Sequence, residues 1–346
     1  MSERVEEQLA RCTEPLLRWY RMNRRDLPWR RDPTPYRVWV SEIMLQQTRI
    51  EAVIPYYERF MAELPELTSL AAVPEERLLK LWEGLGYYSR ARNLKKAAQL
   101  VTEKYGGELP GTAEELRKLP GVGDYTAGAI ASIAFGQPEP AVDGNVLRVV
   151  MRLTACSDDV LEQKTRRRVA QQLRAVYPHG REAGLLTEAL MELGETLCVP
   201  NGEACCAACP LRALCLAGER GEAGYYPSRN AKKERRLEEK TVLLPHCGDR
   251  WALRRRAEKG LLAGLWEFPT LEGRLSEAEL TERLKPAKIV PCGEAKHVFT
   301  HIEWHMTGYI AELERESGES VWETAETIRQ SYAIPTAFKA YLKKLY

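Results

Sequence analysis

The chain has 346 residues, and 44% of them are hydrophobic, which is enough to build the cores of two globular domains. Its formal net charge at pH 7 is only +2, so an acidic ligand such as a nucleic acid would have to be bound by local basic patches. Candidate patches are Arg24–Arg25, Arg30–Arg31 and Arg166–Arg168, although such a run is more often a solvated surface. Charge alone therefore does not decide what the chain binds.

The sequence also indicates the cellular compartment of the protein. No run of about 18 apolar residues is available for a membrane span, and the first residues lack the apolar core of a signal peptide. Four cysteines, Cys12, Cys156, Cys247 and Cys292, are scattered singly, as expected of reduced thiols. We therefore expect a cytoplasmic protein.

The order of predicted elements indicates two domains. Residues 1–220 show helical periodicity, which is clearest over 53–61, 78–82 and 185–193. A polar stretch over 221–240, rich in glycine and basic residues, predicts a linker. Residues 241–346 favour strands, and a helical pattern follows at the end. Predicted strands include 241–244, 251–253, 288–290 and an alternating run over 298–306, and the final helix covers 336–345.

Glu42 is the first candidate for chemistry. On a helix, Val38, Trp39 and Leu45 would surround it with an apolar face. Desolvation there would raise the pKa of the carboxyl, and a carboxyl that stays protonated near neutral pH can act as a general acid. A half-exposed glutamate paired with Arg37 or Arg49 is an equally good interpretation of this segment alone.

A glycine-rich turn precedes a helix of small residues at 126–130. In Leu119-Pro120-Gly121-Val122-Gly123, two glycines would let backbone amides approach a phosphate at the start of that helix. We interpret the segment as the hairpin of a helix-hairpin-helix motif, with Gly121, Val122 and Gly123 contacting the DNA backbone. An ordinary turn is the competing interpretation, because a single G-V-G is a weak signal.

Asp143 lies in Pro140-Ala141-Val142-Asp143-Gly144-Asn145-Val146, directly before a predicted helix. By itself it is most simply a helix cap. Paired with Glu42 it could serve glycosidic cleavage, in which one carboxyl protonates the leaving group and the other stabilises positive charge on the sugar.

Four cysteines in a loop-like segment predict a metal centre. Cys198, Cys206, Cys209 and Cys215 have the spacing C-x7-C-x2-C-x5-C. All-sulfur ligation selects zinc or an iron-sulfur cluster, and a single C-x2-C step favours a 4Fe-4S cluster over a zinc ribbon. Cys205 is an alternative second ligand, and a chance cluster of buried or disulfide-bonded cysteines is the competing interpretation.

Taken together in this order, these segments resemble the adenine DNA glycosylases of the MutY family, within the helix-hairpin-helix endonuclease III-like superfamily. The resemblance extends through Asp26–Arg30, Trp82–Arg90, Glu188–Gly194 and Gly264–Pro269. It implies a mainly α endonuclease III-like region with six-helix barrel and cluster modules, followed by an α+β Nudix-like lesion-recognition domain. It also implies a monomer, acting near the nucleoid in base excision repair, that removes adenine mispaired with 8-oxoguanine or guanine from double-stranded DNA.

The resemblance assigns roles to individual residues. Glu42 would protonate the adenine, and Asp143 would stabilise the oxocarbenium ion directly or through a covalent sugar adduct. Tyr125 and Asn145 would support this pair. Matching adenine-pocket positions are Arg25, Trp29, Leu45, Glu188 and Met191; Gln47, Thr48, Leu85 and Tyr87 match the opposite-strand side; and Phe299, Thr300 and His301 would recognise 8-oxoguanine.

Departures and alternatives accompany this assignment. The family's first cysteine gap is more often one residue shorter, which keeps Cys205 open as a ligand. Residues 271–285 lack the arranged Nudix-hydrolase box, so pyrophosphate hydrolysis is not expected. Tyr125 stands where related lyases have lysine, so we expect a monofunctional glycosylase. A thymine mismatch glycosylase and a non-catalytic iron-sulfur DNA-binding protein are the alternative functions.

Overall fold

The computed structural model describes residues 2–228, 234–316, 318 and 320–346, so part of the expected linker, 229–233, lies outside the described residues. The chain forms two compact units. The first contains the chain up to Ala72 and again from Asn93 to the linker, and the second contains Val73–Arg92 and the strand-rich C-terminal part. Residues 73–92 thus group with the C-terminal part, whereas the sequence analysis placed them with the helices. No helix in the described ranges is both long and apolar enough to cross a membrane.

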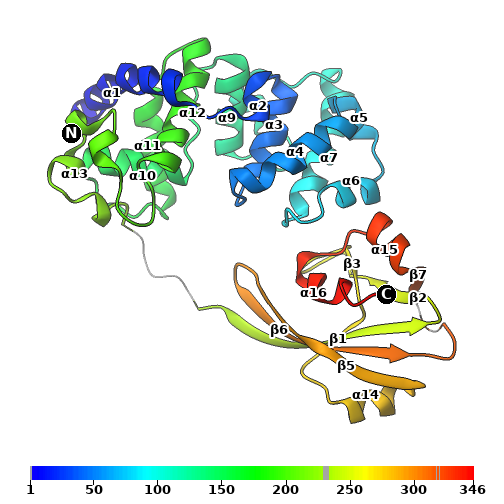
Figure 1. Cartoon of the computed structure of the whole chain (residues 1–346). Coiled ribbons are helices and arrows are strands. Elements are labelled where there is room, and N and C mark those ends of the chain that lie inside the picture. The colour runs from blue at the N-terminus through cyan, green and yellow to red at the C-terminus, as the bar shows by residue number, and fades with distance from the viewer. Residues whose placement is uncertain (1, 229–233, 317, 319) are drawn as a thin grey trace. The chain divides into compact units, whose positions relative to one another are not determined.

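The first unit is helical (Figure 1). Its helices are α1 (Ser2–Asn23), α2 (Pro28–Arg31), α3 (Pro35–Leu45), α4 (Ile50–Glu63), α5 (Leu67–Ala72), most of α7 (Ser89–Tyr105), α8 (Ala113–Leu116), α9 (Asp124–Phe135), α10 (Gly144–Thr154), α11 (Gln163–Arg174), α12 (Arg181–Thr196) and α13 (Leu216–Glu219), with 3-10 turns η1 (Cys206–Ala208), η2 (Arg212–Leu214) and η3 (Ala223–Tyr225). Local sequence explains several helix starts. Thr34 caps α3 ahead of Pro35 at the first helical position, and Asp143 caps α10.

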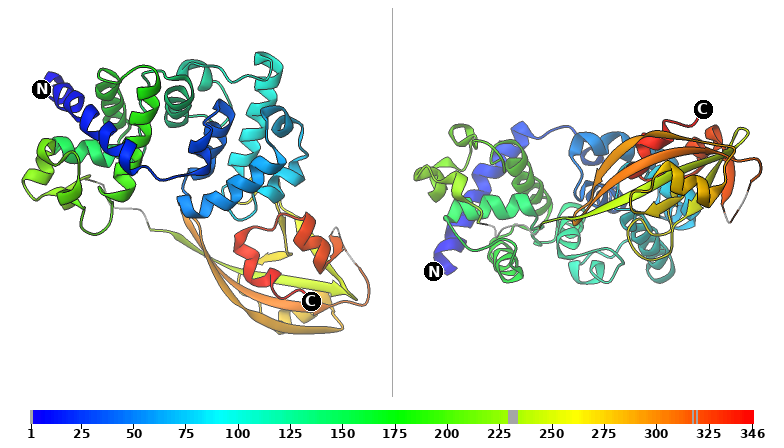
Figure 2. Two further views of the ribbon diagram at one scale, coloured as in Figure 1. Left: turned by 45° about the horizontal axis from the view of Figure 1, so that its top comes forward. Right: turned by 90° about the horizontal axis from the view of Figure 1, so that it is seen from below.

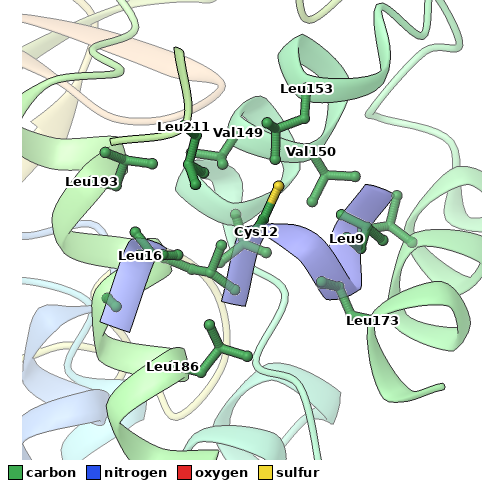
Figure 3. Close-up of a cluster of buried hydrophobic side chains, with 14 of the residues drawn as sticks. Leu9, Cys12, Leu16, Val149, Val150, Leu153, Leu173, Leu186, Leu193 and Leu211 are labelled. Atoms are coloured by element: carbon green, nitrogen blue, oxygen red, sulfur yellow. The ribbon is translucent and has the colours of Figure 1, made fainter. Parts of the chain in front are cut away.

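A large hydrophobic core joins α1 to α10 and α12. Leu9, Cys12 and Leu16 follow one another at helical spacing along one face of α1, and all three are buried. Figure 3 shows Cys12 pointing among the side chains of Val149, Val150 and Leu153. This packing holds in place the two helices that carry Asn145, Glu188 and Met191.

Close backbone approach brings α9 next to the segment before α10. A Cβ atom at Gly128 would lie 2.5 Å from the carbonyl oxygen of Pro140, so only glycine fits there. Because of this contact, the first turn of α9, with Tyr125, lies beside Asp143.

The second unit is built on a seven-stranded sheet in the described part of the chain. Its strands are β1 (Arg236–Cys247), β2 (Arg250–Arg255), β3 (Trp266–Glu267), β4 (Thr270–Glu272), β5 (Lys288–Val298), β6 (Ile302–Glu312) and β7 (Val321–Thr324). The main order is β3-β2-β1-β6-β5, with β4 beside β1 and β7 beside β2. Among the described strands, β1 and β6 are parallel and the other pairs are antiparallel. The long strands β1, β5 and β6 twist together, as Figure 2 shows.

Helices cover both faces of this sheet (Figure 1). Val242 and Leu244 of β1 pack in one core with α15 (Ala325–Ser331), η4 (Thr336–Phe338) and α16 (Lys339–Leu342), whereas Leu243 packs in another with Leu280 of α14 (Glu277–Leu284). Since β1 is buried on both faces over residues 240–246, the middle of the strand is apolar without alternation, in Val242-Leu243-Leu244. The helix α6 (Glu75–Leu81) contacts α15: Lys80 donates to the carbonyl oxygen of Tyr332 at 3.0 Å.

Several predicted elements are confirmed, and one is wrong. Strands at 241–244, 251–253 and 288–290 are present, and the helix predicted over 336–345 is present over 336–342 as a 3-10 turn followed by a short α-helix. The alternating strand predicted over 298–306 is instead two strands: β5 ends at Val298, Phe299–His301 form a turn, and β6 begins at Ile302. The amide of Phe299 donates to the carbonyl oxygen of Ile302 at 2.8 Å, which closes this turn. In addition, β1 starts at Arg236, so the end of the expected linker belongs to the sheet.

Candidate active site

One cavity of about 740 Å³ in the first unit gathers most of the predicted site residues. Helices α3, α9 and α12, the turn after α3, the residues around α2 and the start of α10 form its walls. Predicted residues that line it are Arg25, Trp29, Glu42, Leu45, Gln47, Thr48, Gly123, Tyr125, Asp143, Asn145, Glu188 and Met191. A cavity of this size is ample for one nucleobase and its sugar.

Glu42 is buried at the end of α3 and faces Tyr125. Its exposed fraction is 5%, and the Tyr125 hydroxyl donates to its Oε2 at 2.5 Å. Burial raises the pKa of Glu42 to about 7; the tyrosine hydrogen bond opposes that shift, whereas the nearby carboxyl of Asp143 adds to it. Arg37 pairs with Asp32 instead, and Arg49 stands before α4. The interpretation as a half-exposed ion-paired glutamate is therefore wrong.

Tyr125 stays protonated in this environment. Burial, followed by the neighbouring carboxyls of Glu42 and Asp143, raises the pKa of its hydroxyl well above the ordinary value. The hydroxyl also lies 3.7 Å from the sulfur of Met191. Tyr125 can therefore donate a hydrogen bond at neutral pH, but it offers no amine for a Schiff base.

Asp143 is both a helix cap and a wall of the cavity. Its Oδ1 accepts from the backbone amide of Val146 at 2.8 Å, and its Oδ2 accepts from the side-chain amide of Asn145 at 2.9 Å. Burial raises the pKa of Asp143, while these hydrogen bonds act against the shift. The cap interpretation is confirmed, and capping fixes the carboxyl beside the cavity rather than excluding it from chemistry.

Asn145 is itself fixed by Arg148, one helical turn further along α10. The Arg148 Nη2 atom donates to Oδ1 of Asn145 at 2.7 Å and to the carbonyl oxygen of Gly194 at 2.7 Å. Its Nε donates to the carbonyl oxygen of Cys198 at 2.7 Å. Hydrogen bonds thus connect the Asp143 carboxylate to the start of the cysteine loop.

A charged network forms another wall of the cavity. Arg25 donates to both carboxylate oxygens of Glu192, at 2.6 and 3.0 Å, and Arg30 lies 3.4 Å from Glu188. Tyr20 donates to Glu188 at 2.9 Å. Burial is the largest influence on Glu192 and would raise its pKa, but the hydrogen bonds and positive charges of Arg25 and Arg30 together outweigh burial and lower it. Burial does raise the pKa of Glu188.

The predicted hairpin has the geometry of a tight turn. Gly121 has a φ of +78°, and a Cβ there would lie 2.8 Å from Cβ of Asn93. Gly123 is the N-cap of α9, so the free amides of the first helical turn point out beside the active-site cavity. This arrangement suits a phosphate of the DNA backbone.

Comparison with known proteins identifies the family. The HhH-GPD superfamily of base excision DNA repair proteins matches residues 40–178, and the NUDIX domain matches residues 241–344. The adenine DNA glycosylase of Rattus norvegicus is 38% identical, covering 94% of this chain and 76% of that protein. The adenine DNA glycosylase of Homo sapiens is 37% identical, covering 94% of this chain and 72% of that protein.

The chain belongs to the adenine DNA glycosylase family.

Solved structures agree for the helical region. A thermostable thymine-DNA glycosylase has a TM-score of 0.55 at 26% identity, covering 62% of this chain and 98% of that chain. A non-covalent endonuclease III–DNA complex has a TM-score of 0.52 at 29% identity, covering 62% of this chain and 97% of that chain. The predicted fold class, an endonuclease III-like helical region followed by a Nudix-like α+β domain, is confirmed, as is the class of enzyme, a DNA glycosylase that hydrolyses N-glycosidic bonds.

The remaining predicted recognition residues of this glycosylase lie outside the cavity, in the second unit. Leu85 and Tyr87 are in the turn between α6 and α7, and Phe299–His301 form the turn between β5 and β6. The hydroxyls of Tyr87 and Thr300 are 3.1 Å apart. Two segments that are distant in sequence, and that were assigned to lesion recognition separately, thus meet here.

The four predicted cysteine ligands line one small apolar cavity of about 30 Å³, and the alternative ligand Cys205 lines it as well. Burial raises the pKa of Cys209 to about 11, and Cys198, Cys215 and Cys206 add to this as neighbouring thiols, whereas Cys205 is exposed. In the described ranges, no three histidine, cysteine or acidic side chains form a ready-made metal site. Four thiols that line one cavity, with the amide of Gly218 3.3 Å from the sulfur of Cys215, fit the residue types of a sulfur-ligated cluster.

Several residues of the site were not predicted as such, Arg30 and Glu195 among them. Glu192 lies one helical turn after Glu188 within the same motif, and that spacing was an available signal. Tyr20 and Arg148 gave no signal, because their roles depend on contacts with residues far away in sequence.

Proposed function

We propose that this glycosylase removes adenine paired with 8-oxoguanine, and more weakly with guanine, from double-stranded DNA, acting as a monomer near the nucleoid. Family membership supports the adenine specificity. The 8-oxoguanine preference is supported by the Phe299–His301 turn and its contact with Tyr87, which provide aromatic and hydroxyl groups outside the adenine cavity.

The observation that carries the mechanism is the buried Glu42 carboxyl, with a pKa of about 7, in the same cavity as Asp143. After the adenine has flipped out of the helix, protonated Glu42 donates its proton to the base, and the bond between the base and the sugar breaks with its electron pair leaving on the adenine. The Asp143 carboxylate stabilises the resulting oxocarbenium ion. A water molecule then adds to the sugar and gives up a proton to Glu42, which restores the acid.

Tyr125 and Asn145 orient these two groups. Tyr125 holds Glu42 through its hydroxyl, and Asn145 holds Asp143 through its amide. Among the residues that the structure describes, no lysine lines the cavity, so the product is an intact strand with an abasic site.

The cysteine cavity would hold a 4Fe-4S cluster on Cys198, Cys206, Cys209 and Cys215. When bound, the cluster would cross-link the loop after α12. Arg148 links this loop, at Cys198, to Asn145 and so to Asp143 in the active site. Iron and sulfide analysis of anaerobically purified protein should give about four of each per chain. Cys206→Ser should lose the cluster and Cys205→Ser should keep it; the reverse result would make Cys205 the ligand, and one zinc without sulfide would refute the cluster.

The decisive assay is single-turnover base release with excess enzyme. Duplexes should carry adenine opposite 8-oxoguanine, guanine or cytosine, and a further duplex should carry thymine opposite guanine. Adenine release that is fastest opposite 8-oxoguanine supports the proposal. Release of thymine in preference to adenine would instead favour the thymine mismatch activity, and binding without release by the wild type would favour a non-catalytic role.

A further inference from the structure

A second hollow in the first unit is rich in arginine. It has a volume of about 610 Å³ and is lined by Arg117, Arg166, Arg167 and Arg174, together with Asp124 and Tyr125. Asp124 and Tyr125 also line the active-site cavity, so the two hollows meet at the first turn of α9, directly after the hairpin. We call this hollow the arginine groove.

One face of α11 provides most of these side chains. Arg166, Arg167 and Arg174 point into the groove at helical spacing, whereas Thr165, Val169 and Leu173 are buried on the opposite face. Packing of that apolar face therefore holds the arginines over the groove.

The protein neutralises only part of this charge. Arg174 pairs with Glu139 at 2.6 Å, and Arg117 lies 3.7 Å from Asp124. Arg166 donates its Nε to the carbonyl oxygen of Val160 at 3.0 Å, a hydrogen bond that leaves its charge uncompensated. Arg167 makes no hydrogen bond or ion pair with any residue that the structure describes. The side chains of Arg166 and Arg167 are both exposed.

We propose that the arginine groove binds phosphates of the DNA strand that flank the flipped nucleotide, beyond the phosphate held by the hairpin. The proposal rests on the proposed function in one respect, that the ligand is duplex DNA. Arginines on successive turns of one helix offer several cationic groups in a row, which suits a chain of phosphates. Such interactions position DNA without reading its sequence, and each makes binding more dependent on salt.

The test compares two double variants on the same helix. R166Q/R167Q removes two positive charges from the groove, and the control K164Q/R168Q removes two from residues that do not line it. The dissociation constant of a duplex carrying a reduced abasic analogue opposite 8-oxoguanine is measured against KCl concentration. The variants are first compared with the wild type by thermal unfolding. All four side chains are exposed, and the control loses only the surface ion pairs of Lys164 with Glu162 and of Arg168 with Asp158, so midpoints close to that of the wild type are expected.

We expect R166Q/R167Q to reduce the slope of log affinity against log salt by about 1 for each phosphate that the groove no longer neutralises, and to weaken binding on the order of tenfold. K164Q/R168Q should keep the wild-type slope. Equal changes in both double variants, or no change in R166Q/R167Q, would overturn the proposal.

Two further measurements locate the phosphates and separate their binding from catalysis. Shortening the duplex from one end should abolish the difference in dissociation constant between wild type and R166Q/R167Q, whereas shortening it from the other end should leave that difference unchanged. A difference in dissociation constant that survives both truncations refutes binding of flanking phosphates. The single-turnover rate at saturating enzyme should be unchanged in R166Q/R167Q. If the wild type releases no adenine, the proposed function fails, whereas the salt slopes still decide the groove.

Discussion

Replacing Glu42 with glutamine removes the proton donor and keeps the shape of the side chain. Because general acid catalysis contributes about a hundredfold to ten-thousandfold, we expect the single-turnover rate of Glu42→Gln to fall by that range. The affinity of Glu42→Gln for the duplex should change little. The control Glu195→Gln alters a more exposed carboxyl of the same cavity, and its single-turnover rate should also change little. A wild-type rate in Glu42→Gln would refute the assignment.

The raised pKa of Glu42 also has a cost in stability. Its carboxyl has a pKa of about 7 in the folded protein, against an ordinary value of 4.5, so the folded state binds a proton that the unfolded state has released between these two values. The free energy of unfolding therefore falls as pH rises from 4.5 to 7, and the full cost, up to about 3 kcal/mol, is present above pH 7.

The free energy of unfolding of Glu42→Gln should lack this pH-dependent loss. Relative to the wild type, its thermal midpoint should be higher at pH 8 than at pH 5, since glutamine stays neutral throughout. Removal of the Tyr125 hydrogen bond acts at both pH values and does not alter the comparison. A difference between variant and wild type that is independent of pH would show that Glu42 is ionised in the folded protein at neutral pH.

Glu42 and Asp143 show how far the sequence predicts such a site. Local spacing correctly predicted the apolar face around Glu42 and the cap at Asp143. It could not choose between an ion-paired and a buried Glu42, because the deciding partner, Tyr125, is 83 residues away on α9. Helix packing, which local sequence does not encode, brings these two side chains together.

The hairpin before α9 depends on one glycine. Gly121→Ala would place a side chain in a left-handed backbone conformation and close to Asn93, so we expect a loss of about 1 kcal/mol or more in stability and weaker DNA binding. Gly123→Ala is the matched control, because its φ is −94° and no atom lies within 4 Å of the added Cβ. Thermal unfolding should show a lower midpoint for Gly121→Ala only; equal midpoints would contradict the strain argument.

The predicted strands show where an alternating sequence pattern fails to locate the end of a strand. The buried strand β1 and the edge strand β5 were predicted only in part, over 241–244 and 288–290, and the alternation over 298–306 continued through a turn. A turn of three residues keeps the alternation nearly in phase, and Phe299–His301 contain no glycine or proline to indicate it.

The proposed catalytic residues and the proposed lesion-recognition turn lie in different units of the enzyme. All four proposed catalytic residues line one cavity in the first unit, whereas Phe299, Thr300 and His301 belong to the second. Recognition of the opposite base should therefore be separable from cleavage. Changes in the turn should alter which mispair is bound, and the rate of bond cleavage in the bound complex should be retained.

The double variant Phe299→Ala with His301→Ala tests this separation. A net hydrogen bond is worth about 1 kcal/mol, and removal of the aromatic ring adds to it, so preference for 8-oxoguanine over guanine in binding should fall about tenfold. Phe299 also packs on Trp304 at a ring separation of 4.9 Å, so thermal unfolding must first show that the sheet is intact. His305→Ala, an exposed histidine on β6, serves as the control. Full discrimination in the folded double variant would move recognition to Gln47, Thr48, Leu85 and Tyr87, and a lower single-turnover rate at saturating enzyme would show that the second unit also acts on the chemical step.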